Sequence, residues 1–567
     1  MAARVEILIP EDGGTPRDPA RIQRLGENKF LVRAAREEGP NPLDHAVSRV
    51  ELVLRNPHDS FADVTLAIDV SGDDLATRRD ARWGAPEERD YVYVRPPGGH
   101  WQRVDGEFHG WEALVALRLP PGDTLLGLSP HYSYADYLRF VNSLPTGPLL
   151  SKVLLGHSDD GREHWALRIS DPRGPAEKKL RCLLVARAHA YETFGSFAIE
   201  GMVRYLLSSP PGANLPSFDI EIWPMLNVDG VARGYEYSQG FEQGSERNLT
   251  ACVSGRLYLA RIDDWQPHVL VTLHNWITPR ALDVISYTDV DDAGRRIDRA
   301  QEIFRGFFPP QTEFGKAWLN DVDEPLSHNW AREEQKERPD LTNPEVYARV
   351  RYRTEIWVPE LPWFGRDDDD PAEIARDTGR QYLRALLQTL ARIHALPNAV
   401  LEPSLQMSFL SERQPSRVEP PSMQIGSGAL ISGSSLILNR VAFSHGLMLP
   451  AETRVTYRLD GEWETFAAVT GICKSISSRT IVEFQVDGDG RRLWTSEECH
   501  PESRRERIAI DVRGIQELTL SSRTLSGPQG STTLAWADAK LGCHLGSEMP
   551  ARGGETPLAL RARRACG

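Results

Sequence analysis

The chain has 567 residues, more than one hydrophobic core usually serves, so we expect several domains. Its 80 acidic residues outnumber its 66 basic ones, and the net charge of −14 disfavours a nucleic-acid partner, because phosphate binding needs concentrated Lys and Arg. No apolar run approaches the roughly 18 residues that a membrane helix needs, so we expect no membrane partner either.

The cysteines and the N-terminus indicate a compartment. The six cysteines are scattered without a C-x-x-C pair, which predicts reduced thiols rather than a disulfide framework. Residues 1–19 lack the apolar centre of a signal peptide. We therefore expect a cytoplasmic protein.

Residues 1–132 are rich in short alternating runs, such as FLVRAA, ADVTLAIDV and DYVYVRP, separated by Gly, Pro and Asp. Period-2 patterning at this spacing predicts a β-sandwich. Nothing in this region has a catalytic pattern.

Residues 133–395 alternate between apolar strands and amphipathic helices. The runs RCLLVARAH, FDIEIWPML and HVLVTLHNW read as strands, and a long helix begins at Pro371 after Asp370. This alternation predicts an α/β domain with a mixed, mostly parallel sheet and flanking helices.

The remaining chain reads as a linker, a second sandwich and a tail. Residues 396–421 are rich in Pro and Ser and predict a linker, whereas residues 422–547 return to alternating β-runs. Residues 548–567 are predicted to be a disordered tail. The expected fold is multidomain, with the α/β domain between two β-sandwich domains.

Polar residues with metal-binding chemistry stand at the ends of predicted strands. His189 and Glu192 follow a buried strand where it turns into a helix, and His274 ends another apolar strand. Sites in open α/β sheets form at the carboxyl ends of strands, and zinc accepts imidazole and carboxylate ligands. These three residues are the predicted ligands of one Zn²⁺ in the catalytic domain.

Glu355 is the predicted general base, because we read it as ending a further strand, where a carboxylate could take a proton from a zinc-bound water. Each of these four residues has an ordinary alternative. An isolated H-x-x-E is more often a helix-start pair, a lone His after an apolar strand is usually a hydrogen-bonded core residue, and a single Glu on a strand is usually solvated. Their occurrence together, in this order, favours a site.

These segments resemble the M14 zinc carboxypeptidases, especially the cytosolic carboxypeptidase branch. The stretch ARAHAYETFGSFAIEG resembles the His-Pro-Gly-Glu metal motif with Ala190 and Tyr191 in place of Pro and Gly. PMLNVDGVARG, VTLHNW and YRTEIW resemble the family's later motifs. The resemblance implies a zinc-carboxypeptidase fold and an N-terminal β-sandwich over roughly the first 395 residues.

The expected substrate-binding arginines of that family are displaced here. Tyr237 stands where the resemblance implies the Arg that polarises the scissile carbonyl, and Leu249 stands where an Arg should follow Asn248. Arg233 and Arg247 are close by in sequence and are the candidate substitutes, although both can equally be ordinary loop arginines. The predicted substrate-binding residues are therefore Asn248, Arg247, Arg233 and Tyr237.

The C-terminal runs, including TRVTYRLDGEWETFAAVTGI and LAWADAKL, resemble the NPCBM family of carbohydrate-binding modules. The resemblance implies a lectin-like sandwich with a glycan as its ligand. A sandwich that serves only stability or assembly is the rival interpretation, and Trp494 and Trp536 fit a core better than a sugar platform.

The predicted function is a zinc-dependent metallocarboxypeptidase that hydrolyses C-terminal peptide or isopeptide bonds of a peptide or protein substrate, which the terminal module would allow to be glycosylated. The displaced arginines motivate a first alternative, a zinc amidohydrolase that needs no free C-terminal carboxylate. The second alternative is a non-catalytic glycan- or protein-binding protein on a peptidase scaffold.

Overall fold

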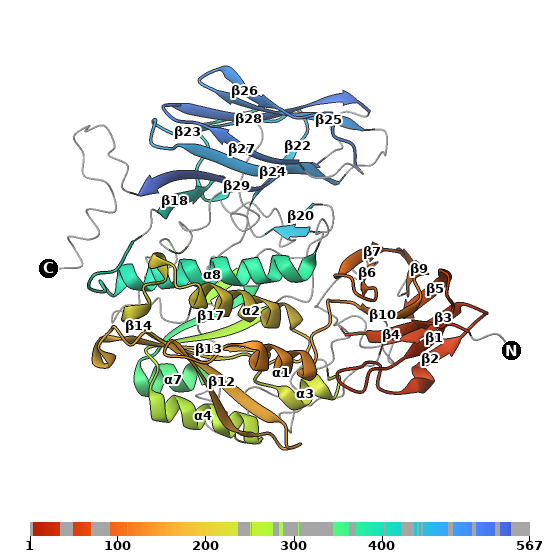
Figure 1. Ribbon diagram of the computed structural model, residues 1–567. Helices are drawn as coiled ribbons and strands as arrows, with labels where there is room; N and C mark the ends of the chain where they lie inside the picture. The colour runs from red at the N-terminus through yellow and green to blue at the C-terminus, as the bar shows by residue number, and fades with distance from the viewer. Residues whose placement is uncertain are drawn as a thin grey trace. The chain divides into compact units, whose positions relative to one another are not determined.

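The computed structural model describes residues 4–34, 49–69, 91–109, 112–235, 250, 252–275, 283–286, 304, 344–361, 370–401, 404–420, 436–438, 441–443, 446–474, 480–501, 506–527 and 533–545. The chain divides into two compact units (Figure 1). The first unit contains the described residues up to 401, together with 441–443, and the second contains most of the described residues beyond them.

Two five-stranded sheets form a β-sandwich at the start of the first unit. One sheet has the order β1 (Glu6–Leu8), β4 (Glu51–Asn56), β10 (Gly122–Gly127), β6 (Tyr91–Arg95) and β7 (Gln102–Asp105). The other has the order β2 (Ile22–Arg24), β3 (Lys29–Arg33), β5 (Ala62–Asp69), β9 (Glu112–Leu119) and β8 (Glu107–His109). Alternate residues such as Leu52, Leu54, Val64, Leu66 and Val115 share one core, as period-2 patterning requires.

A seven-stranded mixed sheet forms the centre of the first unit. Its order is β11 (Leu150–His157), β12 (Glu163–Ser170), β14 (Phe218–Trp223), β13 (Leu180–Ala186), β15 (Val269–Asn275), β17 (Glu355–Leu361) and β16 (Asp283–Ser286). The central strands β14, β13, β15 and β17 are parallel, and the pairings toward both edges are antiparallel. The parallel strands are buried and largely apolar because both faces of the sheet are covered, although β14 also contains Asp219 and Glu221.

Helices cover both faces of this sheet. The helices are α1 (Tyr134–Ser143), α2 (Thr193–Leu207), α3 (Val228–Ala232), α4 (Val253–Trp265), α7 (Pro344–Tyr352) and α8 (Pro371–Ile393). Figure 1 shows α2 and α8 along one face and α4 and α7 along the other. The expected α/β domain is confirmed, and its helix start at Pro371 is capped by the Asp370 carboxylate, which accepts from the amides of Ala372 and Glu373.

The second unit is also a two-sheet β-structure. One sheet has the order β18 (Ser404–Phe409), β29 (Thr533–Leu545), β24 (Thr465–Lys474) and β27 (Glu506–Asp511), with β22 (Gly446–Pro450) also paired to β29. The other has the order β19 (Arg417–Glu419), β23 (Arg454–Arg458), β28 (Glu517–Ser526), β25 (Ile481–Gly488) and β26 (Arg491–Thr495). Trp536 lies in the core between them and is 1% exposed.

The predicted linker over residues 396–421 is wrong in its second half. Strand β18 pairs with β29 along its whole length, and β19 pairs with β23, so residues 404–419 contribute a strand to each sheet of the second unit. Pro and Ser are frequent around these two short strands, and this composition is typical of a linker, so the sequence did not indicate the strands. The predicted disordered tail, 548–567, lies outside the described residues.

Among the described residues, no helix is both long and apolar enough to cross a membrane.

Candidate metal centre

Two neighbouring parallel strands bring the predicted metal ligands together. Strand β13 runs parallel to β15, with Ala186 opposite Leu273. His274 is therefore at the carboxyl end of β15, next to the point where β13 ends and the turn carrying His189 and Glu192 begins. The sheet register, rather than closeness in sequence, makes these side chains converge.

The three side chains form one compact cluster. His189 Nδ1 lies 2.8 Å from Glu192 Oε1, and His274 Nδ1 lies 3.2 Å from both His189 Nδ1 and Glu192 Oε1. His189 and Glu192 are buried, and the His274 side chain is 12% exposed. The cluster therefore has one partly open side, which lies toward His274.

The donor set and its spacing fit zinc. Ligands about 2.0–2.2 Å from a tetrahedral zinc ion lie about 3.3 Å apart, close to the separations between these nitrogen and oxygen atoms. Glu192 Oε2 is buried and has no hydrogen-bond partner within the part of the chain that the structure describes. Such an acceptor is costly in a dry site unless a cation or a proton satisfies it.

The electrostatics of the cluster favour an ionised carboxylate. Burial alone would raise the pKa of Glu192, but the charges and hydrogen bonds of His189 and His274 outweigh it and hold this pKa well below its usual range. A carboxylate that stays ionised beside two imidazoles is the state in which these residues can ligate a divalent cation.

Arg187 and Asn227 hold the turn that carries His189. The buried Arg187 guanidinium donates from Nη2 to the carbonyl of Ala190 at 2.5 Å and from Nη1 to Ser196 Oγ at 2.9 Å. Asn227 donates its backbone N–H to the carbonyl of Arg187 at 2.9 Å. The sequence analysis missed both roles, although an arginine directly after the apolar run CLLVA was a usable signal.

Arg187 also adopts an unusual backbone conformation, with φ of 60°. A non-glycine residue in the left-handed region costs free energy, and such conformations cluster at functional sites. The tertiary contacts of its side chain compensate for this cost and fix the direction in which the chain leaves β13.

Glu355, the predicted general base, is not at this cluster. It is the first residue of β17 and lies opposite Val269, the first residue of β15, at the amino end of the parallel strands. Its carboxylate accepts from Trp357 Nε1 at 2.7 Å and pairs with His394 Nε2 at 3.0 Å. The prediction is wrong because β17 begins, rather than ends, at this residue.

Glu360 occupies the position beside the cluster. It lies opposite His274 in the register between β15 and β17, five residues beyond Glu355. At about 3.3 Å per residue, the two glutamates are separated by about 16 Å along the strand. The carboxyl end of β17 therefore has a glutamate in the place for which Glu355 was predicted.

Arg233, the described candidate for substrate binding, is engaged elsewhere. Its Nε donates to Asp160 Oδ2 at 2.7 Å and its Nη2 donates to Asp160 Oδ1, which makes a bidentate ion pair. Asp160 also pairs with Arg162 at 2.5 Å. The Arg233 fork is thus occupied by a carboxylate of the protein itself. The other three candidates, Tyr237, Arg247 and Asn248, lie outside the described residues.

Comparison with family models identifies two segments of the chain. Residues 139–253 match the family described as "Zinc carboxypeptidase" (Peptidase M14), and residues 406–542 match the family described as "NPCBM/NEW2 domain". Both resemblances inferred from the sequence are confirmed: the chain carries a zinc metallopeptidase segment of the M14 type and an NPCBM segment.

Curated relatives agree with the first of these segments. The chain is 38% identical over 112 residues to cytosolic carboxypeptidase 2 of Danio rerio and 33% identical over 112 residues to that of Homo sapiens. Each match covers 18% of this chain, and only 16% and 12% of the respective relative. The chain thus matches a small part of each relative's length.

Solved structures share the fold. A metallo-carboxypeptidase from Burkholderia cenocepacia has a TM-score of 0.53 at 15% identity and covers 69% of this chain and 100% of its own. One from Pseudomonas aeruginosa has a TM-score of 0.52 at 15% identity and covers 68% of this chain and 99% of its own. The first unit therefore has the metallocarboxypeptidase fold.

Proposed function

We propose that this chain is a zinc-dependent metallocarboxypeptidase that binds one Zn²⁺ through His189, Glu192 and His274. The observation that carries the proposal is the spacing of these three donors, which suits a tetrahedral ion, within a domain of M14 type. The buried Glu192 Oε2 further supports a cation at this position.

Glu360 is the general base in this proposal, in place of Glu355. Zinc, when bound, acts as a Lewis acid and lowers the pKa of a coordinated water to about 7. The carboxylate of Glu360 would take the proton of the attacking water and pass it to the leaving amine. This assignment is supported by the register, which puts Glu360 beside His274.

Arg187 has a positioning role in the proposed mechanism. Its hydrogen bonds to the carbonyls of Ala190 and Tyr132 fix the turn between β13 and α2, so His189 and Glu192 keep their directions without reorganising during the reaction. The guanidinium is wholly buried and acts through the turn rather than on the substrate.

A zinc amidohydrolase is the second candidate, and a specific observation favours it. Arg233 pairs with Asp160 and so does not offer its fork to a substrate carboxylate in this structure. If none of Tyr237, Arg247 and Asn248 recognises a terminal carboxylate, the enzyme would accept substrates that lack one.

Hydrolysis of matched peptides separates the two candidates. The zinc-loaded protein is assayed on one peptide as the free acid and as the C-terminal amide, with His189→Ala as the inactive control. A metallocarboxypeptidase cleaves the free acid and loses a factor of about 100 or more on the amide, because a desolvated arginine is left without its partner. Equal rates on both would assign the amidohydrolase, and no hydrolysis in either case would refute both.

The NPCBM segment is proposed to bind a glycan and thereby to bring glycosylated substrates to the enzyme. Trp536 cannot be the stacking platform, because it is 1% exposed and packs at ring-centroid distances of 5.3 Å from Phe484 and 6.4 Å from Trp494. A glycan array probed with the full chain tests this proposal, and an array without signal would favour a sandwich that only stabilises the protein. The cytoplasmic location remains a prediction.

A further inference from the structure

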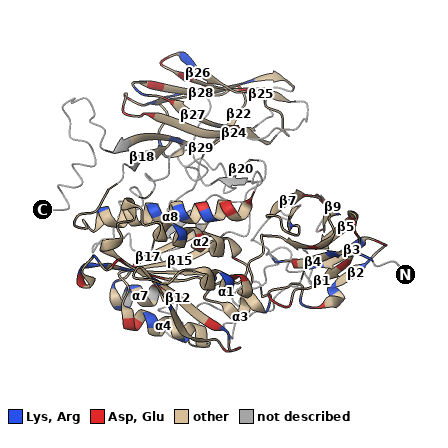
Figure 2. Cartoon of the chain, viewed as in Figure 1, with Lys and Arg blue, Asp and Glu red and all other residues tan. Residues whose placement is uncertain are grey.

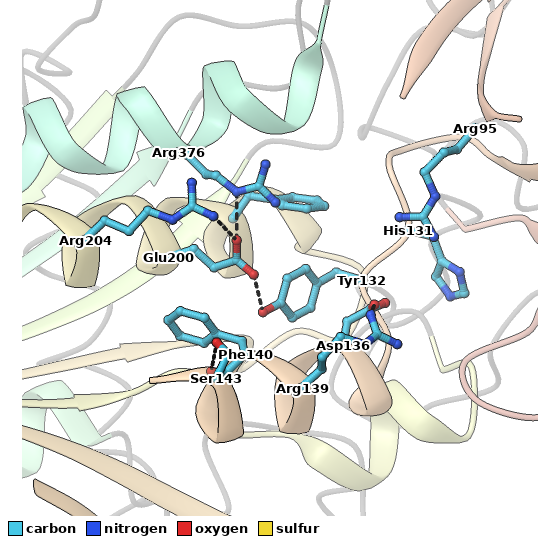
Figure 3. Close-up of a pocket in the computed structure, with 11 residues that line it drawn as sticks. Arg95, His131, Tyr132, Asp136, Arg139, Phe140, Ser143, Glu200, Arg204 and Arg376 are labelled. Atoms are coloured by element: carbon cyan, nitrogen blue, oxygen red, sulfur yellow. Dashed lines mark hydrogen bonds and ion pairs between the residues drawn. The ribbon is translucent and has the colours of Figure 1, made fainter. Parts of the chain in front are cut away.

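A second cavity in the first unit lies apart from the metal ligands. Its volume is about 280 Å³, and it is bordered by α1, α2, the first turns of α8, Arg95 at the end of β6, and the segment before α1 (Figure 3). The lining residues are Arg95, His131, Tyr132, Asp136, Arg139, Phe140, Ser143, Phe197, Glu200, Arg204 and Arg376. None of the predicted metal or substrate residues belongs to this set.

The charge of this cavity is opposite to that of the chain. Four arginines and one histidine line it, against only two carboxylates, in a protein whose net charge is −14. Figure 2 shows basic and acidic residues in alternation along α8, whereas the cavity at its start collects arginines from four separate elements. Such convergence of like charges costs free energy unless an anion compensates for it.

Both carboxylates of the cavity are already used by the protein. Glu200 accepts from Tyr132 Oη at 2.9 Å and from Arg376 Nε at 2.7 Å. Asp136 closes the capping box of α1 by accepting from the Ser133 amide at 3.0 Å, and it pairs with Arg139 at 2.5 Å. Arg376 pairs in addition with Glu373 at 2.6 Å, whereas Arg204 makes only longer ion pairs, with Glu200 and Glu373.

Arg95 and Arg204 keep donors for a ligand. Within the described residues, Arg95 makes no hydrogen bond or ion pair, and its guanidinium lies 5.2 Å from the centre of the Trp101 ring. Arg204 lies 3.7 Å from Glu200 and 3.9 Å from Glu373, beyond hydrogen-bonding distance in both cases. Guanidinium groups present several N–H donors in a planar fork, which matches phosphate and carboxylate oxygens.

The surroundings of the cavity increase the attraction of these arginines for an anion. Three of its lining residues are buried aromatics, Tyr132, Phe140 and Phe197, and the rings of Tyr132 and Phe197 meet edge to face with centroids 5.0 Å apart. The Arg376 side chain beside them is only 19% exposed, whereas Arg139 and Arg204 stand more exposed at the rim. A partly dehydrated basic wall attracts anions more strongly than a solvated surface patch does.

We propose that this cavity is a binding site for a small polyanion that carries phosphate or carboxylate groups, held by Arg95, Arg204 and Arg376. Its volume equals that of several water molecules at about 30 Å³ each, so a molecule of the size of pyrophosphate or citrate enters with room to spare. Figure 3 shows Arg204 and Arg376 on one side and Arg95 on the other, so the ligand bridges α2 and α8 to the sandwich.

A single residue, Arg187, connects the cavity to the turn that carries His189 and Glu192. The carbonyl of Tyr132 accepts from Arg187 Nη1 at 3.2 Å, and the same guanidinium donates to Ala190 in the turn between His189 and Glu192. Anions also coordinate metal ions directly, so the test must separate binding in the cavity from binding at the proposed zinc centre. The proposed metal ligands His189, Glu192 and His274 do not line the cavity, which makes this separation feasible.

Isothermal titration of pyrophosphate and, separately, citrate into the full chain tests the proposal. The titrations use the His189→Ala background to remove the proposed zinc centre, and compare it with an added R95A/R204A pair and with an added R380A. Arg380 is the matched control, because it lies one turn beyond Arg376 on α8, is similarly charged and pairs with Asp377. We expect the R95A/R204A pair to raise Kd by about tenfold or more and R380A to leave it unchanged.

The outcomes distinguish the ligand classes and can overturn the site. Binding of pyrophosphate alone assigns phosphate, binding of citrate alone assigns carboxylate, and binding of both assigns general polyanion recognition, provided the R95A/R204A pair weakens it by about tenfold or more. A Kd that this pair leaves unchanged, or no binding of either probe at low salt, overturns the proposal. Circular dichroism verifies the fold of each variant, and R204K, which keeps the charge, should retain part of the affinity.

Discussion

Glu360 and Glu355 offer a direct test at the scale of single residues, because one strand contains both. Replacing Glu360 by Gln should lower kcat by about 100-fold or more while zinc content stays the same, since a general base contributes on this order. Glu355→Gln is the matched control and should change kcat by less than about twofold. Steady-state kinetics with metal analysis would contradict the reassignment if Glu355→Gln were the inactive variant.

The sequence predicts that His189, Glu192 and His274 lie together, as they do, but it misplaces the proposed general base. His189, Glu192 and His274 follow long apolar strands, so their place at the carboxyl ends was readable. Strand β17 contains Pro359, and because proline cannot donate to the ladder of a central strand, the sequence alone does not indicate that the strand continues past it. Only the register with β15 shows that the strand continues to Leu361.

At the scale of elements, the crossing of α2 and α8 depends on two glycines. A Cβ on Gly201 would lie 1.8 Å from the carbonyl oxygen of Arg376, and one on Gly379 would lie 2.0 Å from that of Ala198. Contacts this short are with backbone and cannot be relieved by a side-chain rotation. The close approach of the two helices therefore requires glycine at both positions.

Gly379→Ala should destabilise the protein by about 1–3 kcal/mol, as overpacking typically does, even though alanine favours helices. Gly195→Ala in α2 is the control, since its Cβ would meet Ala186 at an ordinary 3.6 Å. It should be neutral or stabilising by up to about 1 kcal/mol. Urea unfolding measures the change in the free energy of unfolding for each variant. Equal changes in the two variants would contradict the packing argument.

The strands of the second unit illustrate which elements escape sequence reading. The long runs of β24, β25 and β28 alternate clearly and were recognisable, whereas β19 has three residues. A strand of that length carries too little pattern to outweigh the prolines and serines around it. Its existence depends on the long-range pairing with β23, which no local window contains.

At the scale of the whole molecule, a buried ion network ties the N-terminal sandwich to the α/β domain. Arg49 pairs with Glu51 at 2.7 Å and donates to the carbonyl of Tyr235 at 2.6 Å, beyond α3. His131 Nε2 lies 2.8 Å from Glu51 Oε2 on the other side. The network makes the sandwich part of the same folded unit as the sheet, which agrees with the division of the chain.

Acid should weaken this junction. Burial would raise the pKa of Glu51, but Arg49 and His131 lower it from 4.5 to about 2. Because the folded-state pKa is depressed, the stabilisation is fully present above pH 4.5 and is lost as the pH falls toward 2. Its size is on the order of 3 kcal/mol, from about 1.4 kcal/mol per pKa unit.

The measurement compares urea unfolding of the wild type and Glu51→Gln at pH 7, 5 and 3. The variant should be less stable by about 3–5 kcal/mol at pH 7, since it removes the carboxylate that pairs with the buried Arg49, and this difference should shrink at pH 3. Asp123→Asn, which breaks an exposed pair with Arg55 in the same sandwich, should cost less than about 1 kcal/mol. A difference for Glu51→Gln that is constant with pH would refute the linkage.

The proposed zinc centre is tested most directly by the metal content of the purified protein. The full chain, reconstituted with excess zinc and then desalted, is analysed alongside His189→Ala and the control His268→Ala, which alters an exposed histidine just before β15. We expect one zinc ion per chain in the wild type and in His268→Ala, and none in His189→Ala. Zinc retained by His189→Ala, or absent from the wild type, would contradict it.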